Sequence, residues 1–252
     1  MSSTASFDVD AGRSPTDLGS SVELSVRPAT VLAWALGMFG VIMALNLAAT
    51  PIYHTTENQP LRLFVRFFLF DMEANLPTFF NFCLLLGVAL LALVVAARAT
   101  AAGNPWRRHW LGLGALFLLL AYDEAASLHE NLGYFVKTLM QAEGFLSFAW
   151  VVPGLIFVVV MGLAYSRFLL AMPRRTAGLI LLSGGCYVFG AIVLEMVGAD
   201  YYERHGTIDT TAYLLLTTVE ETFEMGGLML FSWVLLGLLA GRGGRVAGTL
   251  HG

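Results

Sequence analysis

The feature that most constrains this chain is a series of long apolar segments. Several runs of about 20 residues contain few or no charged side chains, and this is the length an α-helix needs to cross a bilayer core. Only 13% of the 252 residues are charged, about half the share found in soluble domains. The chain is therefore expected to be an all-α, polytopic membrane helix bundle.

Six transmembrane helices are predicted. Five of them have expected limits of 31–49, 76–97, 148–170, 177–197 and 211–239. The remaining helix, third along the chain, begins near Trp110 and runs into an acidic stretch. Pro51 is expected to end the first span. Residues 61–70 are predicted to form a short interfacial helix, because Arg62 and Arg66 share one face and can reach lipid headgroups. Residues 1–28 are expected to be a disordered tail, 29–241 a single membrane domain and 242–252 a short tail.

Orientation follows from the positive charges near the ends of the spans. Ten of the 14 lysines and arginines fall on the side that holds both termini, and four fall on the other side. By the positive-inside rule both termini are expected in the cytoplasm, in what is interpreted as a bacterial inner membrane. No basic patch favours nucleic acid. The expected partners are the lipid bilayer and a small-molecule or lipid substrate.

Acidic residues inside the spans give the strongest functional signal. Asp123 and Glu124 follow the apolar run 111–120, and an acid at mid-bilayer costs about 2.5–3.5 kcal/mol. At about 1.5 Å per residue, Asp123 lies roughly 20 Å and Glu224 roughly 22 Å from the cytoplasmic ends of their helices. Acids at similar heights on other segments are Glu130, Glu195, Glu220 and Glu221, with Glu73 just outside the second span. A carboxylate-rich cluster is therefore predicted in the outer half of the membrane.

Helical faces support this convergence. In a regular helix Asp123, Ser127 and Glu130 fall on one narrow stripe, whereas His129 lies about 120° from Asp123. Either the helix loosens there or His129 points elsewhere. Glu220, Glu221 and Glu224 fall within about 100° of one another on the last span.

Charge balance predicts a cation at this cluster. No lysine or arginine lies within these spans at the level of the acids, so the carboxylates must hold protons or bind a metal. Oxygen ligands suit Mg²⁺, Ca²⁺ or Mn²⁺, and an added imidazole suits iron or zinc. The Glu-x-x-His pairs of di-iron bundles do not occur in this chain. The candidate metal ligands are Asp123, Glu124, His129, Glu130, Glu195, Glu220, Glu221 and Glu224, with Glu73 as a further candidate.

Four sequence motifs resemble those of a family of uncharacterised bacterial multi-pass membrane proteins. They are DMEANLPT at 71–78, DEAASLHE at 123–130, GAIVLE at 190–195 and EETFE at 220–224. The resemblance spans the second to the sixth helix. It implies the membrane fold and the co-occurrence of these acids, and it implies no particular reaction.

Three classes of function fit these features. The first is a metal-dependent membrane enzyme, in which the cation activates water or a redox partner. The second is a proton- or cation-coupled transporter, and the third is a structural membrane protein with protonated buried acids. The sequence shows neither internal repeats nor evident broken helices, which disfavours transport. The sequence therefore favours a divalent-metal site and leaves the reaction open.

Overall fold

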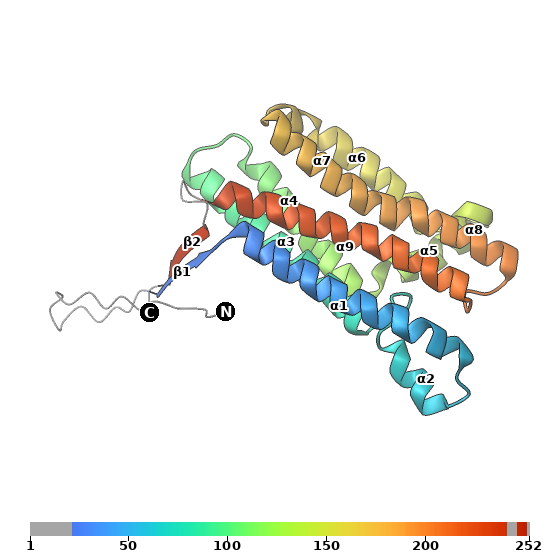
Figure 1. Ribbon diagram of the computed structural model, residues 1–252. Helices are drawn as coiled ribbons and strands as arrows, with labels where there is room; N and C mark the ends of the chain where they lie inside the picture. Colours follow the sequence, from blue (N-terminus) through green and yellow to red (C-terminus); the bar gives the residue numbers. More distant parts are fainter. Residues whose placement is uncertain (1–21, 241–245, 251–252) are drawn as a thin grey trace.

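The chain folds into a bundle of membrane-length helices. The computed structural model describes residues 22–240 and 246–250 (Figure 1). Five helical segments are long and apolar enough to cross a membrane: α1 (Pro28–Thr55), α3 (Leu76–Ala101), α6 (Val151–Leu170), the continuous segment Arg174–His205, and α9 (Thr211–Leu239). A sixth span results if α4 (Arg107–Ala126) and α5 (Leu128–Met140), which meet at an 80° bend, are counted together. The predicted all-helical membrane bundle is confirmed.

Helix α9 lies at the centre of the bundle. It packs against α1 and α7 on either side and also against α3, which in turn packs along α4 (Figure 1). Half of its apolar window is buried inside the protein, whereas only 11% of the window of α6 is buried. The acids of α9 are therefore surrounded by protein, and α6 stands at the edge of the bundle.

The segment Arg174–His205 contains one irregular turn. Helix α7 (Arg174–Val188) continues through a π-helical turn, η2 (Phe189–Leu194), into α8 (Glu195–His205). Gly190 lies in this turn, and a Cβ atom there would be 2.7 Å from Glu224 Cγ and 2.8 Å from the Glu220 carbonyl oxygen. Glycine is therefore required where η2 meets α9, since any side chain would push the two elements apart.

The first span is longer than expected. Pro51 lies inside α1, which ends only at Thr55, so the prediction that Pro51 ends the helix is wrong. A proline removes one main-chain hydrogen bond. Thr50 and Thr55 lie on either side of it, and their hydroxyls donate to the carbonyl oxygens of Asn46 and Pro51, at 2.9 and 2.8 Å.

The predicted short helix is present as α2 (Gln59–Arg66). Its arginines contact protein, contrary to the expectation that they reach headgroups. Arg62 donates to Asp209 at 2.9 Å and lies 4.5 Å from the ring centroid of Tyr53, and Arg66 Nη2 lies 3.4 Å from Met72 Sδ. Helix α2 is thus tied to the loop before α9.

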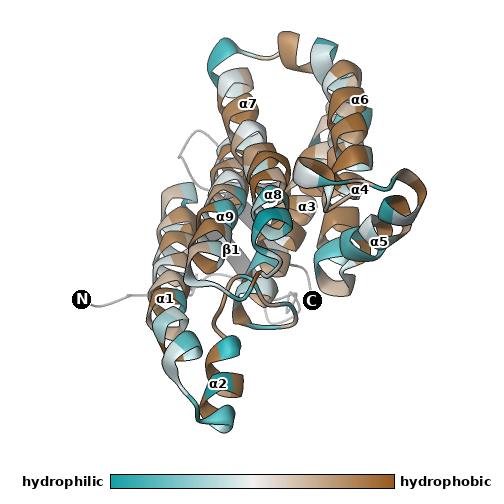
Figure 2. Cartoon of the chain, turned by 90° about the vertical axis from the view of Figure 1, so that its right-hand side faces the viewer, coloured by the Kyte–Doolittle hydropathy of each residue, from teal (hydrophilic) through white to brown (hydrophobic). Residues whose placement is uncertain are grey.

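The two ends of the described chain meet. Strand β1 (Val22–Val26) pairs antiparallel with β2 (Val246–Leu250), so the inner parts of the two expected tails lie together at one end of the bundle. Residues 1–21, 241–245 and 251–252 lie outside the described residues. Figure 2 shows that apolar residues predominate along α6 and α7, whereas α2, α5 and α8 contain more polar residues. The short 3₁₀ helix η1 (Gly144–Leu146) joins α5 to α6.

Candidate functional site

A cavity of about 910 Å³ lies between α4, α5, α6, α7, α8 and α9. All nine residues named from the sequence line it: Glu73, Asp123, Glu124, His129, Glu130, Glu195, Glu220, Glu221 and Glu224. Two further charged residues that the sequence did not name as candidate ligands, Asp71 and Lys137, also line it. The acids therefore share one cavity, and the contacts inside it divide them into smaller groups.

The helix that carries Asp123 breaks at Ser127. This residue has φ 47° and ψ 45°, in the left-handed region, and the chain turns by 80° between α4 and α5. A left-handed residue interrupts the hydrogen-bond ladder of a right-handed helix. The expected stripe of Asp123, Ser127 and Glu130 along one straight helix is therefore wrong, and of the two alternatives for His129 the helix does loosen. The expectation that the chain has no broken helix, which disfavoured transport, is also wrong.

The bend turns His129 back onto Asp123. The His129 main-chain N–H donates to Asp123 Oδ1 at 2.7 Å, and His129 Nδ1 lies 3.0 Å from Asp123 Oδ2. A carboxylate oxygen only accepts, so the Nδ1 atom carries the hydrogen. Both oxygens of Asp123 are thereby engaged, and in the neutral imidazole Nε2 of His129 would keep a lone pair for another partner.

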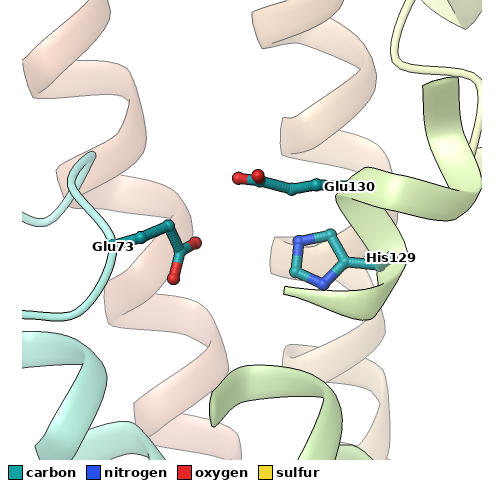
Figure 3. Close-up of side chains that lie close together, drawn as sticks. All are labelled: Glu73, His129 and Glu130. Carbon is teal, nitrogen blue, oxygen red and sulfur yellow. The ribbon is translucent and has the colours of Figure 1, made fainter. Parts of the chain in front are cut away.

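One group of side chains has the spacing of a metal site. Ligand atoms of Glu73, His129 and Glu130 all lie within 4.8 Å of one another, and Figure 3 shows the three side chains pointing towards one another. Glu73 comes from the loop before α3, and His129 and Glu130 come from the first turn of α5. We call these three residues the His129 group.

The loop that holds Glu73 is anchored at both ends. Asn46 of α1 donates to Thr218 of α9 at 2.8 Å and accepts the Phe70 N–H at 3.1 Å. At the other end Asn75 caps α3 by accepting the Thr78 N–H at 3.0 Å. Asn46 was visible in the sequence as the one strongly polar residue of the first span, but its role depends on contacts with distant residues.

Acidic surroundings shift the proton equilibria of this loop. Burial raises the pKa of Asp71 to about 7, and repulsion from Glu195 and Asp209 adds to the shift. Burial also raises the pKa of Glu73, with Glu130 as the next cause. These carboxyl groups lie among like charges, so the loop favours either a proton or a bound cation.

Glu195 and Glu220 form a second group. The Trp150 indole N–H donates to Glu195 Oε1 at 2.9 Å, and the neighbouring Glu220 on α9 is only 9% exposed. The Trp150 ring centroid also lies 5.1 Å from that of His129, so this tryptophan links the pair to the His129 group. The sequence carried no signal for Trp150, which appears there as one more apolar residue near a span end.

The remaining acids, Glu124, Glu221 and Glu224, belong to neither arrangement. They line the same cavity from α4 and α9. Asp123 and Glu124 are adjacent in the chain but project about 100° apart, so the first faces His129 and the second lies beside Asn81 of α3.

The fold and the cavity define an all-helical integral membrane protein with an acid-lined internal site. Residues 29–239 match the family described as a domain of unknown function (DUF8692), and the chain belongs to this family. The match covers all the membrane-length helices except for the first residue of α1. Comparison with curated proteins and with solved structures gave no match.

Proposed function

We propose that this protein is a metal-dependent membrane enzyme that binds one divalent cation through Glu73, His129 and Glu130. The observation that carries this proposal is the mutual spacing of their ligand atoms, all within 4.8 Å. Ligands about 2 Å from a common metal lie roughly 3–4 Å from each other, so small side-chain rotations suffice to bind.

Asp123 takes a different role from the one expected. The sequence favours it as a ligand, but both its oxygens contact His129. Histidines that bind metals commonly donate their second ring N–H to a carboxylate, which fixes the ring and its tautomer. Asp123 is therefore proposed as a positioning residue that directs Nε2 of His129 towards the cation.

The ligand set favours a transition metal. One imidazole and two carboxylates suit Zn²⁺, Fe²⁺ or Mn²⁺ better than Ca²⁺ or Mg²⁺. Three protein ligands leave at least one position for water or substrate, and this is the arrangement of catalytic sites. A cation there would lower the pKa of bound water or polarise a carbonyl or phosphoryl oxygen.

The cavity favours a lipid as the substrate. Away from the acids the cavity wall is apolar. It includes Phe117 of α4, Phe157 and Met161 of α6, Ile180 of α7 and Phe231 of α9. Helix α6 is sparsely packed against its neighbours, so a hydrocarbon chain has an accessible route from the bilayer. A polar headgroup would then lie at the level of the carboxylates.

Transport fits the cavity less well. The acids occupy one end of the cavity. Asp123 is the first acidic residue after the start of α4 at Arg107, and Glu224 is the last acidic residue before the end of α9 at Leu239. At the opposite end lies an aromatic cluster in which Phe168 contacts Trp106, His109, Trp110 and Tyr165, none of which is an acid. A cation path across the membrane would need further acidic groups there. In the proposed orientation both termini are cytoplasmic and the acids face the outside of a bacterial inner membrane.

Metal analysis of the purified protein tests this function. Wild type, Glu73→Gln, His129→Ala and Glu130→Gln would be loaded with Zn²⁺ in detergent, desalted and assayed by mass spectrometry. About one tightly bound Zn²⁺ is expected in wild type, with a loss of at least tenfold in affinity in each variant. The matched control is Glu203→Gln, an exposed glutamate of α8 that does not line the cavity. Zn²⁺ binding that is absent in wild type, or equal in all five proteins, would refute the proposal.

A further inference from the structure

We propose that α5 is an interfacial helix at the opening of the cavity, with one face in the lipid and Lys137 on the other face binding the phosphate of an anionic phospholipid. The inference names the class of lipid that the proposed function leaves open. It rests on the lipid-binding cavity proposed above and does not depend on a bound metal.

The position of α5 follows from the length of α4 and from the bend at Ser127. Helix α4 has 20 residues and is therefore about 30 Å long, which matches the hydrocarbon core of a bilayer. Helix α5 leaves the end of α4 at 80° and has only 13 residues, too few to cross a bilayer. A helix that turns by nearly a right angle at the end of a membrane-length helix runs along the interface.

One face of α5 is apolar and exposed. Leu128, Leu132, Phe135 and Leu139 are spaced by four, three and four residues, so they lie within about 60° of one another around the helix. We call these four residues the apolar stripe. They are 38–67% exposed, and none of them lines the cavity. Large apolar side chains exposed together mark a surface that an apolar partner covers.

The acyl chains of the bilayer are the partner that fits the apolar stripe. Helix α5 follows directly on α4, whose last turns expose Leu119 and Tyr122 on the surface of a membrane-length helix. The apolar stripe thus continues a surface that the bilayer covers. Amphipathic helices in the interface bury their apolar face about 5–10 Å deep.

The opposite face of α5 belongs to the cavity. Glu130, Gly133 and Lys137 lie roughly 160° around the helix from the apolar stripe, and all three line the cavity. Gly133 is buried, and a Cβ atom there would lie 3.5 Å from the Cβ and main-chain nitrogen of Trp150. This contact and the hydrogen bonds of His129 to α4 fix the rotation of α5, so the apolar stripe stays on the outside.

Lys137 is the group that selects an anionic lipid. Among the described residues that line the cavity it is the only lysine or arginine, and within residues 22–240 and 246–250 it forms no ion pair. Its side chain both lines the cavity and is exposed, so it lies at the opening. It is about 10 Å along the helix from Glu130, far enough for a phosphate at Lys137 to avoid that carboxylate. A basic side chain at a membrane interface attracts anionic headgroups.

The first experiment measures the depth of α5 in the membrane. Leu132→Cys, Phe135→Cys and Leu139→Cys are made singly in full-length protein without its two native cysteines, labelled with a nitroxide and placed in lipid nanodiscs. Oxygen and a water-soluble nickel chelate then report lipid and water contact by electron paramagnetic resonance. All three labels should favour oxygen and lie at one depth, whereas a label on Thr207→Cys, in an exposed loop, should favour nickel.

Three results would overturn the interfacial position. Labels at Leu132 and Leu139 that differ in depth by about 10 Å would show that α5 continues across the membrane. Nickel access as high as at Thr207 would place the apolar stripe in water. Spin–spin broadening between labels of two protein copies would make the stripe a contact between protomers.

The second experiment measures lipid selection. Metal-stripped protein is taken from vesicles of equal phosphatidylglycerol and phosphatidylcholine, and the retained lipids are counted by native mass spectrometry. Wild type should retain mainly phosphatidylglycerol, and Lys137→Gln should lower this preference by about fivefold, the effect of one basic residue at a membrane surface. Lys137→Arg should keep it. The matched control is Arg204→Gln, since Arg204 pairs with Asp200 on α8 and does not line the cavity.

The outcomes separate this inference from the metal site. Wild type that retains both lipids equally, or Lys137→Gln that retains phosphatidylglycerol as wild type does, would overturn the lipid site whether or not the protein binds Zn²⁺. Glu73→Gln should lose Zn²⁺ and keep its preference for phosphatidylglycerol. A protein that binds no Zn²⁺ but shows the expected loss in Lys137→Gln would refute the metal site and support the lipid site.

Discussion

Replacing Asp123 with Asn tests how the bend at Ser127 serves metal binding. An Asn oxygen can still accept the His129 main-chain N–H, because Asp123 Oδ1 does so at 2.7 Å. The amide NH₂ would then face His129 Nδ1, now 3.0 Å from Asp123 Oδ2, and two donors cannot face each other. The imidazole must move its hydrogen to Nε2, the atom proposed to bind the cation.

The expected cost follows from the role of Asp123. Removing a carboxylate that orients a metal-binding histidine typically weakens metal binding by about 10- to 100-fold, or about 1.4–2.7 kcal/mol. Competition between the purified protein and a Zn²⁺ chelator at constant pH measures this change. The ¹⁵N shifts of the His129 ring should show the hydrogen moving from Nδ1 to Nε2.

Two results would refute this reasoning. A loss as large as that of His129→Ala would make Asp123 a direct ligand, and an unchanged affinity with an unchanged tautomer would leave it no role at the metal. Asp200→Asn is the matched control, since Asp200 pairs with Arg204 on α8 and does not line the cavity.

Three other predictions concern packing, proton linkage and orientation. Gly190→Ala should lower the free energy of unfolding by about 1–3 kcal/mol, because its Cβ would lie 2.7 Å from Glu224 Cγ, and a thermal melt should show the loss. The control Gly178→Ala, whose Cβ would have no atom within 4 Å, should not lower the melting temperature. Zn²⁺ affinity should fall as pH drops, because carboxylate ligands must lose their protons to bind and the pKa of Glu73 is raised. A Zn²⁺ affinity that does not change between about pH 8 and pH 6 would contradict carboxylate ligation. In a background without Cys83 and Cys186, a cysteine at the exposed position Thr207 should react with an impermeant thiol reagent added from outside intact cells, and labelling from the cytoplasmic side alone would reverse the topology.

The sequence predicted the helical bundle well because apolar segment length is a strong signal. The last helix, α9, runs from Thr211 to Leu239, as predicted. The second and fourth predicted spans correspond to α3 and α6, whose ends lie within a few residues of the expected limits. Pro51 misled the prediction because a proline inside a membrane helix costs one hydrogen bond, and nearby threonine hydroxyls bond carbonyl oxygens of the same helix.

The division of the acids could not be predicted in the same way. Depth and helical face bring the nine candidate residues towards one another, and they do line one cavity. Their individual partners depend on the left-handed Ser127, on the π turn before Glu195, and on Trp150 and Asn81. Each of these depends on contacts between distant segments, which a helical periodicity does not contain.

The π turn Phe189–Leu194 has a further consequence for how this segment is built. One inserted residue changes the angular phase of the helix by about 100°, so α7 and α8 need not present the same side to their neighbours. Before the insertion, Ser183 and Tyr187 are packed closely against Gly227 of α9; after it, Glu195 turns to Trp150 beside α6. A single continuous span thereby contacts α9 before the turn and reaches Trp150 after it. Deleting one residue from this turn would keep the span long enough for the bilayer but rotate Glu195 away from the cavity.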